Sequence, residues 1–213
     1  MDYVFSIKTS IMFFPIIACL FTIPYILKQY HKYGSINKLR TLIVYSFILY
    51  MMTIYFLVIL PLPDISEVVN NKFEYNLIPF SFINDIIKET SFNIMIPSTY
   101  LKALTEHCIY VVIFNILMTV PFGMYLRYYY KASFKKVLFL SFFLSLFFEL
   151  TQLTGLYFIY PKPYRLFDID DLLLNTTGGV LGYFLFGLIE KYLPSRDKID
   201  EDSKEKGQVI SGL

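Results

Sequence analysis

The stretch Thr41–Pro63 reads TLIVYSFILYMMTIYFLVILPLP and contains no charged side chain. A helix of about 20 apolar residues crosses the hydrocarbon core of a bilayer, and it satisfies its backbone polar groups internally. Thr41–Pro63 therefore predicts a transmembrane helix. Four further stretches have the same apolar character, and they are Thr9–Leu27, His107–Leu126, Val137 to about Leu156, and Leu172–Ile189. We expect an all-α integral membrane protein, a bundle of about five transmembrane helices.

The composition of the 213-residue chain also favours a membrane protein. Hydrophobic residues make up 56% of the chain and charged residues only 17%, against about 25% charged residues in soluble domains. A net charge of +2 is too small to indicate nucleic-acid binding. The two cysteines, Cys19 and Cys108, lie in apolar stretches, so they indicate neither a disulfide framework nor a metal site. We expect no cofactor, no metal site and no nucleic-acid partner.

Lysine and arginine are unevenly distributed between the loops. Residues 28–40 and 127–136 contain Lys and Arg but no acidic residue, whereas residues 64–106 contain six acidic residues and three Lys. Loops rich in Lys and Arg stay on the cytoplasmic side of a membrane. The pattern predicts a multi-pass protein of the cell membrane with its N-terminus outside and its C-terminus inside.

Three segments follow from this organisation. Residues 1–40 hold the first transmembrane helix and a basic cytoplasmic loop, and residues 41–190 form the main membrane domain. Within residues 191–213 the stretch Ser195–Lys206 is almost entirely polar and charged, so we expect residues 191–213 to form a disordered cytoplasmic tail. Within the long second loop, residues 84–89 favour a short amphipathic helix on the outer surface, with an irregular loop as the alternative.

The fourth apolar stretch contains one acidic residue, Glu149. At about 1.5 Å per residue it lies roughly 18 Å from Val137, in the outer half of the membrane. An acid at that depth is costly and indicates a functional site. Gln152 follows three residues later on the same helix face. The alternative is a protonated Glu149 that serves packing only.

Arg165, Asp168, Asp171 and Asn175 lie in and after the loop that precedes the fifth stretch. The planar guanidinium of Arg165 suits a carboxylate or a phosphate, and it is the natural counter-ion for Glu149. Asp168 and Asp171 share one helix face with Asn175. The two acids also fit the positions of a helix cap, which leaves a purely capping role open.

Small residues follow Asn175 at helical spacing. Gly178 and Gly182 form a small-xxx-small pair with Gly179 beside it, and such glycines let a second helix approach closely. We expect them to draw the fifth helix against the fourth, with Asn175 facing Glu149.

Asn115 is a further polar residue at membrane depth, where it suits either the site or a bond between helices. The chain contains a series of motifs in order, which are Asn76-Leu-Ile-Pro-Phe80, Asn115-Ile-Leu with Pro121-Phe-Gly123, Glu149-Leu-Thr-Gln152, Arg165-Leu-Phe-Asp168-Ile-Asp-Asp171, and Asn175-Thr-Thr-Gly-Gly179 with Gly182. In this order the motifs resemble the VanZ-like family of bacterial membrane proteins, over roughly residues 41–189.

The resemblance implies an association with low-level resistance to teicoplanin-type lipoglycopeptides. It also implies a set of functional residues, which are Glu149, Gln152, Arg165, Asp168, Asp171 and Asn175. Asp170 is an extra acid within the run, which leaves open which of the adjacent acids matters.

Three functions are compatible with these residues. The leading hypothesis is binding of a polar head group or envelope component, with membrane lipid and a lipid-linked cell-wall component or a lipoglycopeptide as partners. The alternative is an enzyme that modifies a lipid-linked substrate, where Asp168, Asp170 and Asp171 would hold Mg²⁺ or Ca²⁺. A small transporter with Glu149 as proton site is disfavoured by the few spans. We assign no catalytic residue and no oligomeric state.

Overall fold

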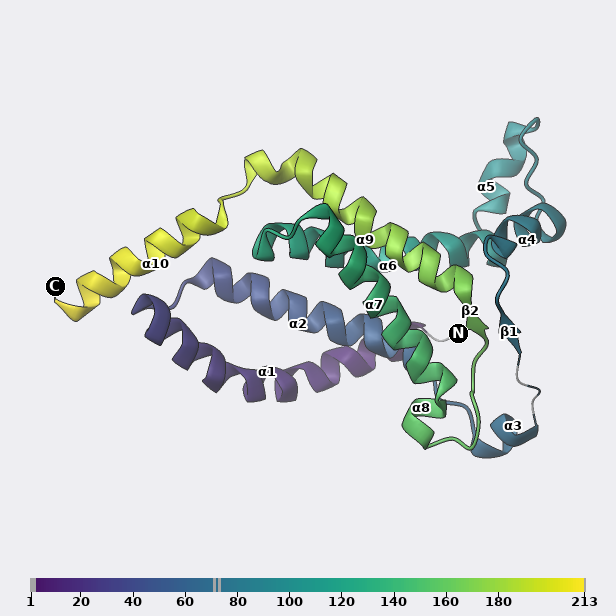
Figure 1. Ribbon diagram of the computed structural model, residues 1–213, viewed down its shortest axis with the longest axis horizontal. Coiled ribbons are helices and arrows are strands. Elements are labelled where there is room, and N and C mark those ends of the chain that lie inside the picture. The colour runs from purple at the N-terminus through teal and green to yellow at the C-terminus, as the bar shows by residue number, and fades with distance from the viewer. Residues whose placement is uncertain (1–2, 71, 73, 213) are drawn as a thin grey trace. The chain divides into compact units, whose positions relative to one another are not determined.

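Five long apolar helices dominate the computed structural model, which describes residues 3–70, 72 and 74–212 (Figure 1). Each is long and apolar enough to cross a membrane. Their bounds are α1 Tyr3–Tyr33, α2 Lys38–Ile59, α6 His107–Tyr130, α7 Phe134–Leu153 and α9 Ile169–Ile189. The expectation of an all-α membrane bundle is confirmed. Four helices begin before the expected residue, because the helical backbone continues beyond the apolar core that a span requires. In contrast, α2 ends at Ile59 and α7 at Leu153, before the expected Pro63 and Leu156.

The chain forms two compact units. One comprises residues 1–62 and 189–213, and the other comprises residues 63–188. The sequence placed its divisions at residues 40 and 190 instead. The difference arises because α2 packs against α1 within the first unit, whereas the sequence grouped it with the later spans.

The first unit contains α10, Arg196–Ser211, in the tail that was expected to be disordered. That expectation is wrong for these described residues. The hydroxyl of Ser195 accepts a hydrogen bond from the backbone N–H of Lys198 at 3.2 Å, which satisfies one free donor of the first turn. Asp197 in the same turn favours the positive end of the helix dipole. Contacts with α1 and α2 stabilise α10 in addition to these features of its first turn.

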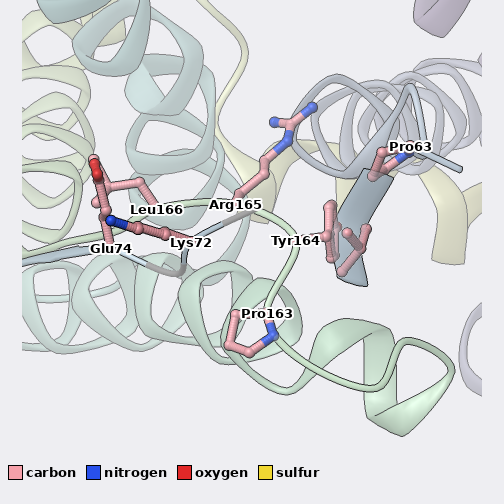
Figure 2. Close-up of a pocket in the computed structure, with 8 residues that line it drawn as sticks. Pro63, Lys72, Glu74, Pro163, Tyr164, Arg165 and Leu166 are labelled. Atoms are coloured by element: carbon pink, nitrogen blue, oxygen red, sulfur yellow. The ribbon is translucent and has the colours of Figure 1, made fainter. Parts of the chain in front are cut away.

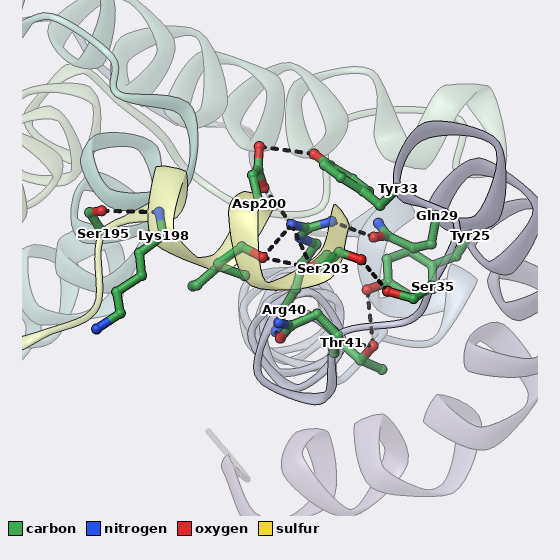
Figure 3. A network of polar contacts seen from close by, with 12 residues as sticks. Tyr25, Gln29, Tyr33, Ser35, Arg40, Thr41, Ser195, Lys198, Asp200 and Ser203 are labelled. Carbon is green, nitrogen blue, oxygen red and sulfur yellow. Dashed lines mark hydrogen bonds and ion pairs between the residues drawn. The ribbon is translucent and has the colours of Figure 1, made fainter. Parts of the chain in front are cut away.

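Arg40 connects α10 to the hairpin of α1 and α2, and its side chain is only 2% exposed (Figure 3). Its guanidinium donates to the Gln29 side-chain oxygen at 2.6 Å and to the Ile199 carbonyl at 3.2 Å. It also forms an ion pair with Asp200 and lies 3.8 Å from the centre of the Tyr33 ring. A buried charge is tolerated when it is paired and hydrogen-bonded in this way.

Two glycines meet where α10 passes the turn between α1 and α2. Gly34 adopts φ +70°, a conformation that favours glycine. A Cβ added at Gly207 would lie 2.3 Å from the Tyr33 carbonyl oxygen and 2.9 Å from the Gly34 Cα. The backbones approach so closely that no side chain fits at Gly207.

The second unit combines α6, α7 and α9 with short elements on the loops. The elements of the long loop are α3 Ile65–Asn70, β1 Tyr75–Asn76, α4 Ser81–Glu89, a 3-10 turn Pro97–Thr99 and α5 Tyr100–Ala103. After α7 come α8 Gly155–Phe158 and β2 Phe167–Asp168. The 3-10 turn Glu190–Tyr192, which follows α9, belongs to the first unit. The short helix expected over residues 84–89 is the second part of α4.

A parallel strand pair joins the long loop to the start of α9. In the register of β1 and β2, Tyr75 is opposite Phe167 and Asn76 is opposite Asp168. Figure 1 shows the two strands running together just before α9 begins. Residues far apart in the sequence are thereby placed beside the acids of the first turn of α9.

Glycines set the packing of α9. A Cβ added at Gly178 would lie 2.0 Å from the carbonyl oxygen of Ile116, and one at Gly182 equally close to that of Val120. Both carbonyls belong to α6, so this pair faces the third span and not the fourth as expected. Gly179 faces α7, where its Cβ would lie 2.0 Å from the Ser141 hydroxyl. The helix that each glycine contacts depends on the rotation of α9 about its own axis, and the spacing of the glycines does not determine that rotation.

Candidate functional site

Asp170 holds the beginning of α4 against the beginning of α9. Its carboxylate accepts hydrogen bonds from the backbone N–H of Phe80 at 2.6 Å and of Phe82 at 3.0 Å. It also accepts one from the Ser81 hydroxyl at 2.8 Å. The residue is only 3% exposed, and these donors stabilise a buried carboxylate. The acid whose role the sequence left open therefore has a structural role.

Asp168 has a double role. Its side chain accepts a hydrogen bond from the backbone N–H of Asp170 at 2.8 Å, so Asp168 caps the beginning of α9. It also accepts a hydrogen bond from the Asn76 amide at 3.0 Å. The Asn76 amide also donates to the Ser81 hydroxyl at 2.5 Å. Burial raises the pKa of the Asp168 carboxyl above its ordinary value, and the hydrogen bonds from Asp170 and Asn76 oppose that shift.

Glu149 is buried on α7, with 3% of its surface exposed. Its carboxylate accepts a hydrogen bond of 3.3 Å from the backbone N–H of Asp168. Gln152, on the same helix face, is 6% exposed. The acid expected at membrane depth is therefore enclosed by protein and lies next to the start of α9.

Asp171 and Asn175 connect α9 to the two neighbouring spans. The Asn115 amide of α6 donates to the Asp171 carboxylate. The Asn175 amide donates to the Ser145 hydroxyl of α7 at 3.0 Å, where the sequence suggested Glu149. The backbone carbonyl of Asn175 accepts from Thr119 on α6 at 2.7 Å. A layer of polar side chains thus crosses α6, α7 and α9 near the ends where α6 and α9 begin.

Arg165 lines a cavity of about 340 Å³ beside this layer (Figure 2). In Figure 2, Tyr164 lies on one side of Arg165, and Lys72 and Glu74 lie on the other. The remaining residues of the lining are Pro63, Val68, Pro163 and Leu166. We call this space the Arg165 pocket.

The positive charge of Arg165 acts on both buried acids of the polar layer. Electrostatic attraction couples its guanidinium to Glu149 and to Asp171. Arg165 therefore lines a cavity and lies within electrostatic range of two carboxylates of the polar layer.

The three acids around the start of α9 diverge. Asp168 and Asp170 bind donors of the β1–α4 region, whereas Asp171 binds Asn115 on α6. Among the described residues, no three His, Cys, Asp or Glu side chains are arranged to hold a metal ion. The ligand set suggested for Mg²⁺ or Ca²⁺ is thus not assembled.

Sequence reasoning missed the partners that organise this region. Asn76 and Ser81 lie about 90 positions before their acidic partners, so no local pattern indicates them. Ser145 is four residues before Glu149 on α7, and that spacing places both on one helix face. The sequence could therefore have revealed Ser145, as it did Asn115, the partner of Asp171.

A comparison with protein-family models matches the larger part of the chain. A sequence profile described as VanZ/LLP1 matches residues 47–190, a range that contains the polar layer, the Arg165 pocket, the whole of α6, α7 and α9, and part of α2. Neither curated proteins nor solved structures gave a match. Since the profile covers more than half of the chain, this multi-pass membrane protein belongs to the VanZ/LLP1 family.

Proposed function

We propose that the protein binds the polar head group of a membrane lipid or of a lipid-linked cell-wall component. The proposed site is the Arg165 pocket with the adjoining polar layer, which we call the polar site. Its residues are Glu149, Gln152, Arg165, Asp168, Asp171 and Asn175. The observation that carries the proposal is that Arg165 lines an accessible cavity while attracting two carboxylates enclosed by protein. By holding such a ligand, the protein lowers the susceptibility of its host to teicoplanin-type lipoglycopeptides.

The basic loops support a location of the polar site on the outer face. Residues 28–40 and 127–136 carry Lys and Arg without acids, so they stay in the cytoplasm. The N-terminus of the chain is then outside and the C-terminus inside. The ends of α6, α7 and α9 that carry the polar layer lie opposite these loops, facing the cell envelope.

The chemistry of the pocket suits a small ligand that carries both a negatively and a positively charged group. Lys72 and Arg165 line it with positive charge, which fits a phosphate or carboxylate. Glu74 also lines the pocket, and its carboxylate offers an acceptor for hydroxyl or amine groups. A volume of about 340 Å³ is at the lower end of the range for small-molecule sites. It suits a head group and not a whole lipoglycopeptide.

Drug susceptibility of a host that lacks the protein tests the proposal. The host is complemented with wild type, Glu149→Gln, Asp171→Asn or the control Glu67→Gln, which changes an exposed acid of α3. We expect wild type and control to raise the inhibitory concentration of teicoplanin, and both site variants to fail at equal membrane abundance. Equal protection by all four proteins would falsify a working role of the polar site. No protection by wild type would remove the resistance function from the proposal.

One observation favours an enzyme as second candidate. Glu149 and Asp171 are two carboxylates that interact electrostatically within the bundle, as acid and base groups of active sites do. The purified protein would then change lipid-linked substrates in nanodiscs, and mass spectrometry of the extracted lipids would detect the product. Turnover that Glu149→Gln abolishes supports the enzyme, whereas ligand binding without product supports the binder.

A further inference from the structure

The loop between α2 and α6 exposes large apolar side chains outside the five long helices. Ile78, Ile87, Ile94, Met95 and Leu101 are each more than two-thirds exposed, and Met95 reaches 84%. None of them belongs to a segment that spans the membrane. Apolar side chains gathered outside the spans indicate a surface that another apolar phase covers. We call residues 77–104 the α4–α5 segment.

Helix α4 separates its apolar and polar side chains. Ile83 and Ile87 are exposed on one face, and Asp85 and Lys88 lie on the opposite face. The helix also packs against α6, which fixes it beside a membrane span. A short helix with this division lies in the plane of a membrane surface, its apolar face towards the acyl chains.

The polar groups around Ile94 and Met95 are turned inward. The backbone N–H of Met95 donates to the Asn93 side-chain oxygen at 2.9 Å, and that of Ile96 to the Asn93 carbonyl at 3.0 Å. The Tyr100 hydroxyl donates to the carbonyl of Ile94 at 2.7 Å. These internal bonds satisfy backbone groups beside Ile94 and Met95, as contact with hydrocarbon requires.

Glu106 holds the two ends of this loop together at the start of α6. Its carboxylate accepts the backbone N–H of Ser91 at 2.7 Å and the Ser91 hydroxyl at 2.5 Å. These hydrogen bonds hold the pKa of the Glu106 carboxyl below its ordinary value. His107, the next residue, begins a membrane span. The apolar loop is therefore held at the level where α6 enters the bilayer.

We propose that the α4–α5 segment inserts its apolar side chains into the leaflet of its own membrane at the His107 end of α6. The occupant of this surface is lipid hydrocarbon, because α4 packs beside a membrane span and Glu106 ties the apolar loop to the first turn of that span. The segment carries two acidic and two basic residues, namely Asp85, Glu89, Lys88 and Lys102. Insertion therefore depends on apolar burial and responds little to salt or to anionic lipid. The proposal is independent of the ligand of the polar site and of the orientation of the chain.

The absence of tryptophan from the sequence permits a direct test by fluorescence. Single-tryptophan variants Ile87→Trp and Met95→Trp are reconstituted in phosphatidylcholine vesicles with brominated acyl chains. Lys88→Trp is the matched control on the polar face of α4. We expect brominated lipid to reduce the emission of the two apolar-face variants by about half or more, and that of the control only slightly. Their emission maxima should lie at shorter wavelength than that of the control.

Two outcomes would overturn the proposal. Iodide in the aqueous phase could quench Ile87→Trp and Met95→Trp as strongly as Lys88→Trp, which would place the segment in water. Alternatively, a short-wavelength emission could be insensitive to brominated lipid and disappear when the protein is diluted with lipid. That result would assign the surface to a second copy of the chain. Gel filtration and circular dichroism of each variant verify that it folds as the wild type does.

Discussion

Arg40 and Glu149 are both buried charged residues, yet their surroundings differ. Arg40 donates hydrogen bonds to groups from α1 and α10, pairs with Asp200 and stacks on an aromatic ring. Glu149 accepts a hydrogen bond of 3.3 Å from Asp168 and lies under the influence of Arg165, which also lines a cavity. A charge that is enclosed by partners stabilises a fold, whereas a charge beside a cavity suits a ligand.

The largest effect is expected from Arg40→Ala. Removing one partner of a buried pair costs about 3–5 kcal/mol, and α10 loses its attachment to the hairpin of α1 and α2. Thermal unfolding in detergent, followed by circular dichroism, should show the loss, and proteases should cut the chain after residue 194 more readily. Lys38→Ala, at an exposed position of the same helix, serves as control. If both variants match the wild type, the network around Arg40 does not hold α10.

Asp170→Asn should have an intermediate effect. The amide replaces one acceptor by a donor opposite the N–H groups of Phe80 and Phe82, and unsatisfied buried groups cost about 1–3 kcal/mol. Hydrogen exchange measured by mass spectrometry should become faster in residues 80–82 than in α7. The exposed acid Asp85 supplies the control, Asp85→Asn. Unchanged exchange in Asp170→Asn would show that the start of α4 is held by other contacts.

Asp168→Asn should have a small effect that depends on pH. Asparagine caps a helix about as well as aspartate. Because the pKa of Asp168 is raised in the fold, its stabilising contribution is present below the pKa of the unfolded chain. The contribution is lost as the pH rises through the folded pKa. The melting temperature of wild type minus that of Asp168→Asn should therefore fall as the pH rises above about 4, the ordinary pKa of Asp, by the equivalent of at most about 1 kcal/mol. A difference that rises with pH would contradict the direction of the shift.

Glu149→Gln should have the smallest effect on stability, and it gives the sharpest contrast with Arg40. The amide keeps the shape of the side chain and removes a charge from a buried position, so the free energy of unfolding should change by less than about 1 kcal/mol or rise. Teicoplanin protection should nevertheless be lost. Melting curves and susceptibility are measured on the same preparations. Destabilisation as large as that of Arg40→Ala would make Glu149 a structural residue.

The sequence predicted the spans well because a long apolar run has few alternatives in a membrane protein. It failed for α10, whose composition indicates disorder, because the partner of Asp200 lies 160 positions away. It also placed the Gly178–Gly182 pair against the wrong helix. Spacing along a helix shows which residues share a face, but the neighbour of that face depends on the packing of the whole bundle.

The proximity of several candidate residues was predictable, whereas the partners of their side chains were not. Glu149, Asp168 and Asp171 do lie near one another, as their order along two adjacent spans suggested. The different partners of Asp170 and Asp171 were not predictable. Consecutive helical residues point in directions about 100° apart, so the two carboxylates contact different helices. One of them meets α4 and the other meets α6. Which helix each side chain contacts depends on the tertiary packing.

The contact between Gly34 and Gly207 has an evolutionary consequence. Both positions lie outside residues 47–190, where the family profile matches, so membership of the family does not require them. A lineage that acquires a side chain at position 207 must also release α10 from the turn, because the Tyr33 carbonyl occupies that space. Glycine at both positions, together with Arg40 and Asp200, should therefore be inherited or lost as a set. The sequences of relatives should therefore show which of them keep all four residues and which have lost them together with the attachment of α10.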